Sequence, residues 1–508
     1  MKPFYITTPI YYVNAAPHIG HAYTTLAADV LNRFHRMRGG ATRFLTGTDE
    51  HGSTLEEVAK VRGKSPLEHA DEIADSFREL WKHLDVRYDD FIRTTDPRHE
   101  ETVQAAFAAL HEKGDIYKGL YRGFYCVSCE TYWTPSELGD KRVCPNADCG
   151  KPLREVEEES YFFKLSRFQG PLLELYRSRP GFLQPALRAP EIVRWVEGGL
   201  KDISVSRTKV AWGVRVPFDP QHTVYVWFDA LLNYISALGW KPGAPAKEFQ
   251  EHWPADVHLV GKEIYRFHAV IWPAMLMALG LELPRCVFAH GWWTVEGEKM
   301  SKSKGNFVDP AAVTQEFGVD AFRYLLFREM PFGSDGNFAK KALCERYNAE
   351  LANGLGNLVA RTAQMVDKYL AGELPAKPPA ERPVKSREAS AAGEEISAAM
   401  ERLAFHDALN RIWAVIGGLN KHIDDEKPWV LSKTDPERLK TVLFDVVWSL
   451  RLVAGWLSPF MPQIAAKIQM QLGVRKFPAP LTAEEVLEGP SGARIQKGPP
   501  LFPRKECK

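Results

Sequence analysis

The sequence has 508 residues, of which 45% are hydrophobic and 25% charged, as in a water-soluble globular protein. Its formal net charge of +1 excludes a strong positive electrostatic field over the whole protein that would attract a polyanion. Residues 340–508 are nevertheless mildly basic, with 25 Lys and Arg against 20 Asp and Glu. The longest uncharged apolar run, 269–281, is too short to cross a bilayer. The N-terminus lacks the pattern of a secretion signal, so we expect a cytoplasmic protein without membrane attachment, with about three domains.

The first elements form an alternating pattern. An apolar, β-prone run begins at residues 4–6, and a helical pattern of apolar residues runs from His18 to Phe34 and ends at Gly39 and Gly40. Residues 43–46 are typical of a second strand. This order predicts a β-α-β unit, and therefore an α/β fold with a parallel sheet and a right-handed crossover.

The rest of the chain separates into three stretches. Residues 116–223 contain many turn residues and short strand-like runs, and we interpret them as an insertion. The α/β character returns in three apolar runs at 224–228, 257–260 and 287–290. From about residue 340, helical patterns at 340–370, 394–421, 436–457 and 460–472 predict an antiparallel bundle, with a surface linker at 372–387 and a tail from residue 477 that wraps the surface or is loose.

Four of the seven cysteines are clustered. Cys126 and Cys129 form a Cys-x2-Cys pair, and Cys144 and Cys149 form a Cys-x4-Cys pair. Fourteen residues separate the two pairs. Zinc prefers four thiolates presented by tight turns, so the cluster predicts one structural zinc ion; the alternative is four reduced thiols in a small core. Cys286, Cys344 and Cys507 are isolated, which favours metal binding in a reducing compartment over a disulfide framework.

One candidate phosphate site lies at residues 18–21, where the first strand gives way to the first helix. This edge of a parallel sheet binds ligands, and a helix N-terminus offers unpaired N–H groups to a phosphate. Gly20 lets a nucleotide approach the backbone, and His18 and His21 can face it together. The alternative is an ordinary capped helix start.

A second candidate is the segment 299–304, which holds three lysines in six residues and follows a predicted strand. Compact ammonium groups suit a polyphosphate, whereas the alternative is a solvated basic loop. Residues 62–65 resemble the end of a Walker A loop, but the upstream glycine is missing, because Val58 stands there.

Residues 18–21 spell HIGH and residues 299–303 spell KMSKS, in this order. These motifs are the signatures of class I aminoacyl-tRNA synthetases, and the chain resembles the bacterial methionyl-tRNA synthetase family over nearly its whole length. The resemblance implies a Rossmann-like parallel-sheet catalytic domain (1–115 and 224–293) split by a connective insertion with a zinc knuckle (116–223). A KMSKS loop and stem-contact region (294–345) and an all-α helical anticodon-binding domain with a C-terminal tail (346–508) would follow.

The resemblance also implies ATP-dependent ligation of L-methionine to the 3′ end of tRNA(Met), including initiator tRNA, through a methionyl-adenylate. ATP would arrive with Mg²⁺, and a monomer is expected, because the chain ends without the extra domain that dimerises some relatives. His18, His21, Lys299 and Lys302 would be catalytic. ATP would be bound by His18, Gly20, His21, Lys299, Ser301, Lys302 and Ser303.

Three aromatic-rich segments and an acidic loop match the family's methionine pocket. The expected binding residues are Ile10, Tyr12, Asp49, Trp227, Ala230, Leu231, Tyr234, Ile264, His268 and Trp272, with Asp49 holding the α-ammonium. Without the resemblance, such apolar segments would be interpreted as core. Likewise, Asn357, Arg361 and a loop residue, Trp429, would contact the anticodon, whereas generically the first two are surface residues and the third is core.

Other functions fit less well. Synthetases for isoleucine, valine and leucine carry a large editing insertion, and the 277 residues between His21 and Lys299 leave little room for one. Cysteinyl enzymes use an active-site zinc set that is absent here. A non-catalytic tRNA-binding derivative would be expected to have damaged signature motifs, and both are intact.

Overall fold

The computed structural model describes residues 2–127, 131–133, 138, 142–145, 149–299, 308–377, 383–474 and 490–507. The chain divides into two compact units, which are described separately. The first consists of Met1–Pro17 and Thr42–His290, and the second of His18–Ala41 and Gly291–Lys508.

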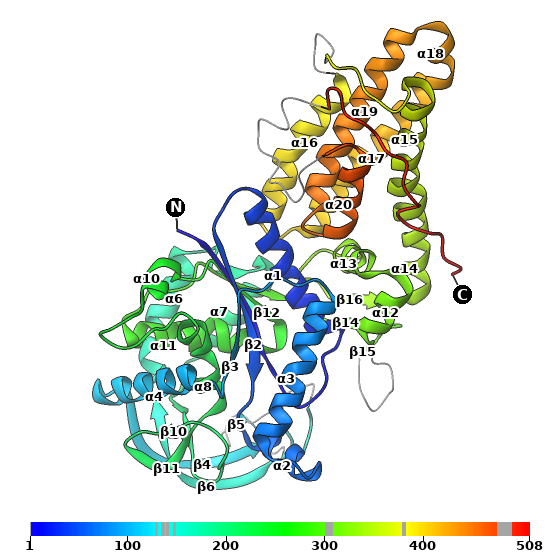
Figure 1. The fold of residues 1–508 in the computed structure, drawn as a ribbon. Helices are drawn as coiled ribbons and strands as arrows, with labels where there is room; N and C mark the ends of the chain where they lie inside the picture. The colour runs from blue at the N-terminus through cyan, green and yellow to red at the C-terminus, as the bar shows by residue number, and fades with distance from the viewer. Residues whose placement is uncertain are drawn as a thin grey trace. The chain divides into compact units, whose positions relative to one another are not determined.

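The first unit is built on a six-stranded sheet in which all neighbouring strands are parallel (Figure 1). The strand order is β3-β2-β1-β12-β13-β7. The strands are β1 (Phe4–Tyr12), β2 (Thr42–Asp49), β3 (Asp90–Arg93), β7 (Leu183–Gln184), β12 (Val257–Gly261) and β13 (Cys286–His290). The predicted parallel α/β sheet is therefore confirmed. From β1 the chain adds strands outward in one direction, to β2 and β3, and later in the other direction, from β12 to β13. Ligands of such sheets bind at the carboxyl ends of the strands where the order reverses, here between β1 and β12.

Helices of this unit include α2 (Ser53–Val61), α3 (Pro66–His83), α4 (Pro97–Glu112), α8 (Val226–Leu231), α9 (Asn233–Ser236), α10 (Lys247–His252) and α11 (Trp272–Leu279). The start of α3 is encoded locally, because Ser65 and Glu68 form a capping box around Pro66. The apolar run 224–228, where we expect α/β character to return, contributes only Val224 to a strand. Strand β11 (Asp219–Val224) ends there and α8 begins at Val226, since a short buried apolar run does not distinguish helix from strand.

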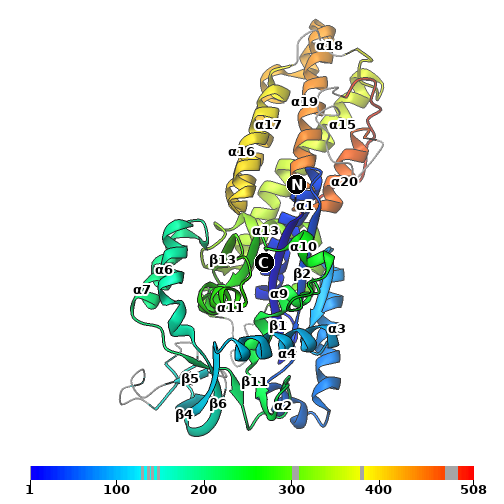
Figure 2. The ribbon, with the colours of Figure 1, turned by 90° about the vertical axis from the view of Figure 1, so that its left-hand side faces the viewer.

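The insertion forms antiparallel sheets and two helices. Figure 2 shows β4 (Ile116–Cys126), β5 (Thr131–Trp133) and β6 (Arg154–Phe163) side by side, and β8 (Ile203–Ser204) completes their sheet. A smaller sheet contains β9 (Ser206–Arg207), β10 (Arg215–Val216) and β11. The helices are α6 (Gln169–Ser178) and α7 (Ala189–Glu197), with short helical turns at Leu165–Phe168 and Ala186–Arg188. Between these turns β7 leaves the insertion and joins the edge of the parallel sheet.

The second unit is mainly helical, as predicted, and Figure 1 shows its long helices running alongside one another. They are α1 (Ile19–Met37), α12 (Pro310–Phe317), α13 (Val319–Arg328), α14 (Lys340–Arg346), a π-helical segment (Tyr347–Gly356), α15 (Asn357–Leu370), α16 (Val384–Glu401), α17 (Phe405–Glu426), α18 (Pro428–Thr434), α19 (Pro436–Leu457) and α20 (Pro462–Gln471). Three short strands accompany them: β14 (Trp293–Val295), β15 (Glu298–Lys299) and β16 (Gly336–Phe338).

Two helix boundaries differ from the prediction. The pattern at 394–421 predicted one helix, but α16 ends and α17 begins within it, because Leu403 adopts a left-handed backbone conformation (φ 57°). The expected linker 372–387 is also shorter, since α16 starts at Val384.

The C-terminal segment 490–507 lies along the helices of the second unit (Figure 1). The Tyr347 hydroxyl donates to the carbonyl oxygen of Pro503 at 3.0 Å, and Cys344 forms a disulfide with Cys507 across a Cα–Cα distance of 5.5 Å. The expectation that these two cysteines stand alone is wrong. They are 163 residues apart, and only the fold brings them together. Within the described part of the chain, no helix has both the length and the apolarity that crossing a bilayer requires.

Candidate active site

Two predicted methionine-binding residues meet at the carboxyl ends of β1 and β2. Tyr12 pairs with Asp49 in the sheet register, and the Val13 amide donates to the Asp49 carbonyl oxygen at 3.2 Å. Both side chains are partly exposed, as is Ile10 two residue pairs earlier on β1. A carboxylate therefore lies at the ligand-binding edge of the parallel sheet, beside an aromatic ring.

A buried pair of polar groups lies farther along this unit. The Tyr234 hydroxyl is 2.6 Å from Nε2 of His268, and Nδ1 of His268 is 3.0 Å from the carbonyl oxygen of Ile264. A carbonyl can only accept, so Nδ1 carries the proton and Nε2 accepts from Tyr234. Burial lowers the pKa of His268 to about 4, although the bond to Ile264 opposes this shift. The imidazole is therefore neutral at physiological pH.

The ring of Trp272 is held by a histidine that the sequence analysis did not identify. Its indole N–H donates to Nε2 of His258 at 3.2 Å, and Nδ1 of His258 lies 2.7 Å from the Thr7 hydroxyl. His258 also lies under Tyr234, with ring centroids 4.2 Å apart. The only sequence signal for this residue was a polar position inside the otherwise apolar strand β12.

Three further predicted methionine-binding residues lie on α8. Ala230 and Leu231 are buried, whereas Trp227 is partly exposed and stacks on Phe267 at 3.7 Å, with an angle of 10° between the rings. Of the ten predicted residues, Ala230, Leu231, Tyr234, His268 and Trp272 are buried, and Ile10, Tyr12, Asp49, Trp227 and Ile264 are partly exposed. Apolar walls, a neutral polar pair and one carboxylate suit a small zwitterion with an apolar side chain.

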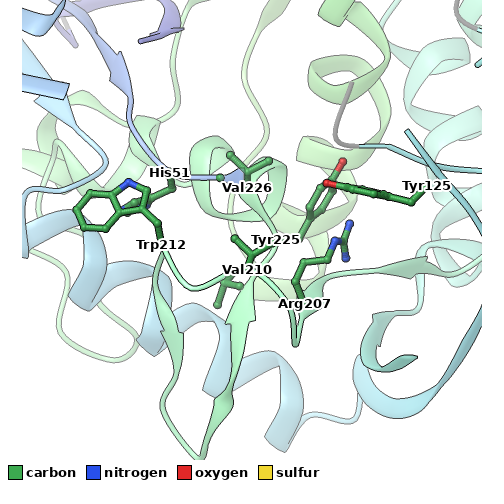
Figure 3. A pocket seen from close by; sticks show the side chains of 9 residues that line it. His51, Tyr125, Arg207, Val210, Trp212, Tyr225 and Val226 are labelled. Carbon is green, nitrogen blue, oxygen red and sulfur yellow. The ribbon is translucent and has the colours of Figure 1, made fainter. Parts of the chain in front are cut away.

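Figure 3 shows a separate small hollow. None of the ten predicted residues lines it. His51 and Trp212 lie on one side, and Tyr225, Tyr125 and Arg207 on the other. The Arg207 guanidinium is 4.1 Å from the centre of the Tyr225 ring, so a cation–π contact occupies much of that wall.

In the second unit, the HIGH residues form the N-terminal cap of α1. Nδ1 of His18 accepts from the Gly20 amide at 3.0 Å, and Nδ1 of His21 accepts from the His18 amide at 3.2 Å. The two rings stack with centroids 3.8 Å apart. Because each neutral ring accepts through Nδ1, each carries its proton on Nε2 and can donate from there. Burial and the neighbouring His18 lower the pKa of His21, which keeps this ring neutral.

The KMSKS segment is described only at its start. Lys299 pairs with Thr294 between β15 and β14. Ser301, Lys302 and Ser303 lie outside the described residues.

Three of the four clustered cysteines are brought together. The sulfur atoms of Cys126, Cys144 and Cys149 lie within 4.8 Å of one another, and those of Cys126 and Cys149 are 3.5 Å apart. Sulfurs at two corners of a tetrahedral zinc site are separated by about 3.8 Å, from Zn–S bonds of about 2.3 Å, so the three described thiols fit such an ion. The fourth predicted ligand, Cys129, lies outside the described residues.

The family model for class I tRNA synthetases (M) matches residues 4–363, and the model for the anticodon-binding domain of methionyl tRNA ligase matches residues 384–505. The chain belongs to the class I methionyl-tRNA synthetase family. The methionine–tRNA ligase of Caldanaerobacter subterraneus subsp. tengcongensis is 50% identical over 99% of the chain and 79% of its own length. That of Thermotoga maritima is 45% identical over 99% of the chain and 81% of its own length.

Solved methionyl-tRNA synthetases share the fold. The Mycobacterium tuberculosis enzyme in complex with methionyl-adenylate has a TM-score of 0.93 and 41% identity, and the match covers 99% of this chain and all of that one. The apo form of the same enzyme has a TM-score of 0.87 and 38% identity over 100% of this chain and 99% of that one.

The three predicted anticodon-contact residues lie on the helical bundle. Asn357 and Arg361 are one turn apart at the start of α15, as predicted, and Arg361 forms a 2.9 Å ion pair with Asp424 near the end of α17. Trp429 lies in the first turn of α18, so the prediction of a loop is wrong: Pro428 starts a helix there. The Trp429 side chain is 44% exposed, which excludes the alternative of a core tryptophan.

Proposed function

We propose that the protein catalyses ATP-dependent ligation of L-methionine to the 3′ end of tRNA(Met) through a methionyl-adenylate. The observations that carry the proposal are the neutral Tyr234–His268 pair, buried in the first unit, and Asp49 at the carboxyl end of β2, and we infer that these residues line one amino-acid pocket. Such a pocket accepts an uncharged thioether and an ammonium group, and it disfavours a charged side chain.

Methionine binds through both ends. The Asp49 carboxylate pairs with the α-ammonium, and Ile10, Tyr12 and Ile264 cover the partly exposed side of the substrate. Trp227, Ala230, Leu231, Tyr234, His268 and Trp272 surround the side chain. Sulfur is polarisable and contacts aromatic rings favourably, so the aromatic walls contribute to selection.

ATP binds at the start of α1 and on the KMSKS segment. The Nε2–H groups of His18 and His21 donate to phosphate oxygens, Gly20 lets ATP approach the backbone at the helix N-terminus, and Ser301 and Ser303 assist. The methionine carboxylate attacks the α-phosphorus, and the bond to the bridging oxygen of pyrophosphate breaks. Lys302 and Lys299 neutralise the charge that pyrophosphate carries away, and Mg²⁺, when bound with ATP, neutralises further phosphate charge.

The second step uses tRNA. The 2′-hydroxyl of the terminal adenosine attacks the methionyl carbonyl and AMP leaves, while Asn357, Arg361 and Trp429 contact the anticodon. The same residues serve elongator and initiator tRNA(Met), and the protein acts as a monomer in the cytoplasm. One zinc ion on Cys126, Cys129, Cys144 and Cys149 stabilises the turns of the insertion. We assign the catalytic, connective, stem-contact and anticodon-binding roles to the segments given by the sequence analysis.

The test is single-turnover formation of methionyl-adenylate followed by transfer to tRNA. The protein should convert labelled methionine to methionyl-tRNA, and Lys302→Ala should slow adenylate formation far more than it changes methionine affinity, because the lysine acts on charge that develops in the transition state. Lys340→Ala, which removes an exposed lysine paired with Glu316, is the matched control and should be unaffected. An unchanged rate in Lys302→Ala contradicts the proposed role.

A further inference from the structure

The carboxylate of Asp229 joins three elements of the first unit. It is fully buried on α8, where its Oδ2 is 2.6 Å from Nδ1 of His51 and its Oδ1 is 2.7 Å from Nε2 of His99. His99 lies on α4, and its Nδ1 is 2.8 Å from the hydroxyl of Ser236, which follows α8 at the end of α9. Each carboxylate oxygen thus has its own imidazole donor.

Asp229 lies between residues assigned to the methionine pocket. Trp227 lies two residues before it on α8 and Ala230 directly after it, so its position fixes the helix that carries them. His51 follows Asp49 by two residues, in the loop that leaves β2. The hydrogen bonds of Asp229 therefore connect the helix that forms the side-chain slot to the loop that carries the ammonium ligand.

The loop is held from its other side as well. The Trp212 indole N–H donates to the Glu50 carbonyl oxygen at 2.5 Å, and the Gly52 amide donates to the Trp212 carbonyl oxygen at 3.2 Å. Figure 3 shows His51 with the Trp212 ring on one side and Val226, the first residue of α8, on the other. His51 is thus confined, and its link to Asp229 fixes the distance between loop and helix.

The charges support an ionised anchor. Burial acts to raise the pKa of Asp229, but attraction to His51 and the hydrogen bonds from His51 and His99 lower it to about 2. Burial acts to lower the pKa of His51, yet Asp229, Glu100 and Glu50 together raise it. Nε2 of His51 lies 3.9 Å from Glu100. A buried carboxylate with two charge-assisted hydrogen bonds is rigidly placed.

We propose that Asp229 is a positioning residue that holds the Asp49 loop in register with α8 and thereby sets the affinity for methionine. The inference rests on the proposed function, because that function identifies methionine as the substrate that the loop and the helix bind together. Asp229 itself does not touch substrate. Its loss should loosen the ammonium ligand relative to the side-chain slot, whereas the groups assigned to the ATP phosphates lie on α1 and at 299–303.

The test is Asp229→Asn, which keeps the shape but removes the negative charge and replaces one acceptor oxygen with a donor, so that the side chain can accept from only one of the two histidines. KM for methionine and KM for ATP are measured by ATP–pyrophosphate exchange, together with the melting temperature. KM for methionine should rise about tenfold, as expected for losing one hydrogen bond to a charged group, and KM for ATP should stay constant.

Asp256→Asn is the matched control. Asp256 is also a buried carboxylate of the first unit, and it accepts from the Tyr5 amide at 2.8 Å and pairs with Arg285 at 2.9 Å, at the amino ends of β1 and β12. It should lower the melting temperature without changing KM for methionine. Simple destabilisation reduces the fraction of active protein, and with it the apparent kcat, but leaves KM unchanged.

A lower melting temperature in Asp229→Asn with an unchanged KM for methionine would overturn the proposal, as would an equal rise in both KM values. If Asp229→Asn does not fold, His99→Leu removes one donor and leaves the carboxylate, and an unchanged KM for methionine in that variant is equally decisive. A native protein that shows no methionine-dependent exchange would instead contradict the proposed function.

Discussion

The hydroxyl of Tyr234 donates to Nε2 of His268 across 2.6 Å, and this bond requires a neutral imidazole. The other ring nitrogen, Nδ1, carries a proton and donates it to the Ile264 carbonyl oxygen. A second proton could therefore bind only at Nε2, which faces Tyr234. Protonating His268 would reverse this bond, because the Tyr234 hydroxyl would then have to accept, and it would place a charge where we propose that an uncharged thioether binds.

The first prediction concerns the pH dependence of stability. The pKa of His268 is about 4 in the folded protein and 6.5 ordinarily, so between these values the unfolded state binds more protons. The free energy of unfolding should therefore fall as the pH drops from about 6.5 to 4, with a contribution of about 2 kcal/mol lost at pH 5. Chemical denaturation of the protein and of His268→Asn at pH 7 and pH 5 isolates this contribution, because other histidines affect both proteins equally. Identical pH dependence in the two proteins would exclude it.

The second prediction concerns Gly20. A Cβ atom at this position would lie 2.9 Å from Cε1 and 3.0 Å from Nδ1 of His18, so Gly20→Ala must displace the ring from its cap. We expect the rate of adenylate formation to fall about tenfold or more while KM for methionine stays constant, as for lost transition-state contacts. Gly417→Ala is the control, since a Cβ there meets no atom within 4 Å. Rapid-quench kinetics that give the native rate for Gly20→Ala would contradict the assigned role of His18.

The third prediction concerns zinc. Metal analysis after dialysis should find one zinc ion per chain, and Cys144→Ser should lose it, because three thiolates hold the ion less tightly than four. Cys286→Ser, which changes a cysteine outside the cluster, should retain the metal. A folded, active protein with almost no bound zinc would contradict the predicted zinc site.

The architecture was predictable where the signal is local. Strands β1, β2, β12 and β13, helix α1 and the bundle helices α14 to α17, α19 and α20 follow from hydrophobic patterns, and the HIGH residues form the expected helix start. The break at Leu403, the helix at Val226 and the Cys344–Cys507 disulfide were not predicted, because each depends on tertiary packing or on partners distant in sequence. Asp229 and His258 were missed for the same reason: their partners, such as His99 and Thr7, are more than a hundred residues away.

The fourth prediction separates anticodon binding from adenylation. Trp429→Ala should remove base stacking of about 1–3 kcal/mol and reduce tRNA charging roughly ten- to a hundredfold at low tRNA. Losing an Arg361 contact to a base edge should cost a similar ~1–3 kcal/mol. Neither change should alter ATP–pyrophosphate exchange without tRNA. Val430→Ala is the matched control, because Val430 is as exposed as Trp429, at 44%, and is its neighbour. If Trp429→Ala stays folded and charges tRNA at the native rate, its anticodon role is wrong.

The central claim is that the pocket of Tyr234, His268 and Asp49 selects methionine for activation. Amino-acid-dependent ATP–pyrophosphate exchange, measured in parallel with all twenty amino acids, tests it most directly. The account predicts strong exchange with methionine and much weaker exchange with leucine, isoleucine and cysteine. An apolar pocket discriminates one methylene by only about 1–3 kcal/mol, so a close analogue such as homocysteine should also be adenylated. Exchange with leucine as fast as with methionine would contradict it.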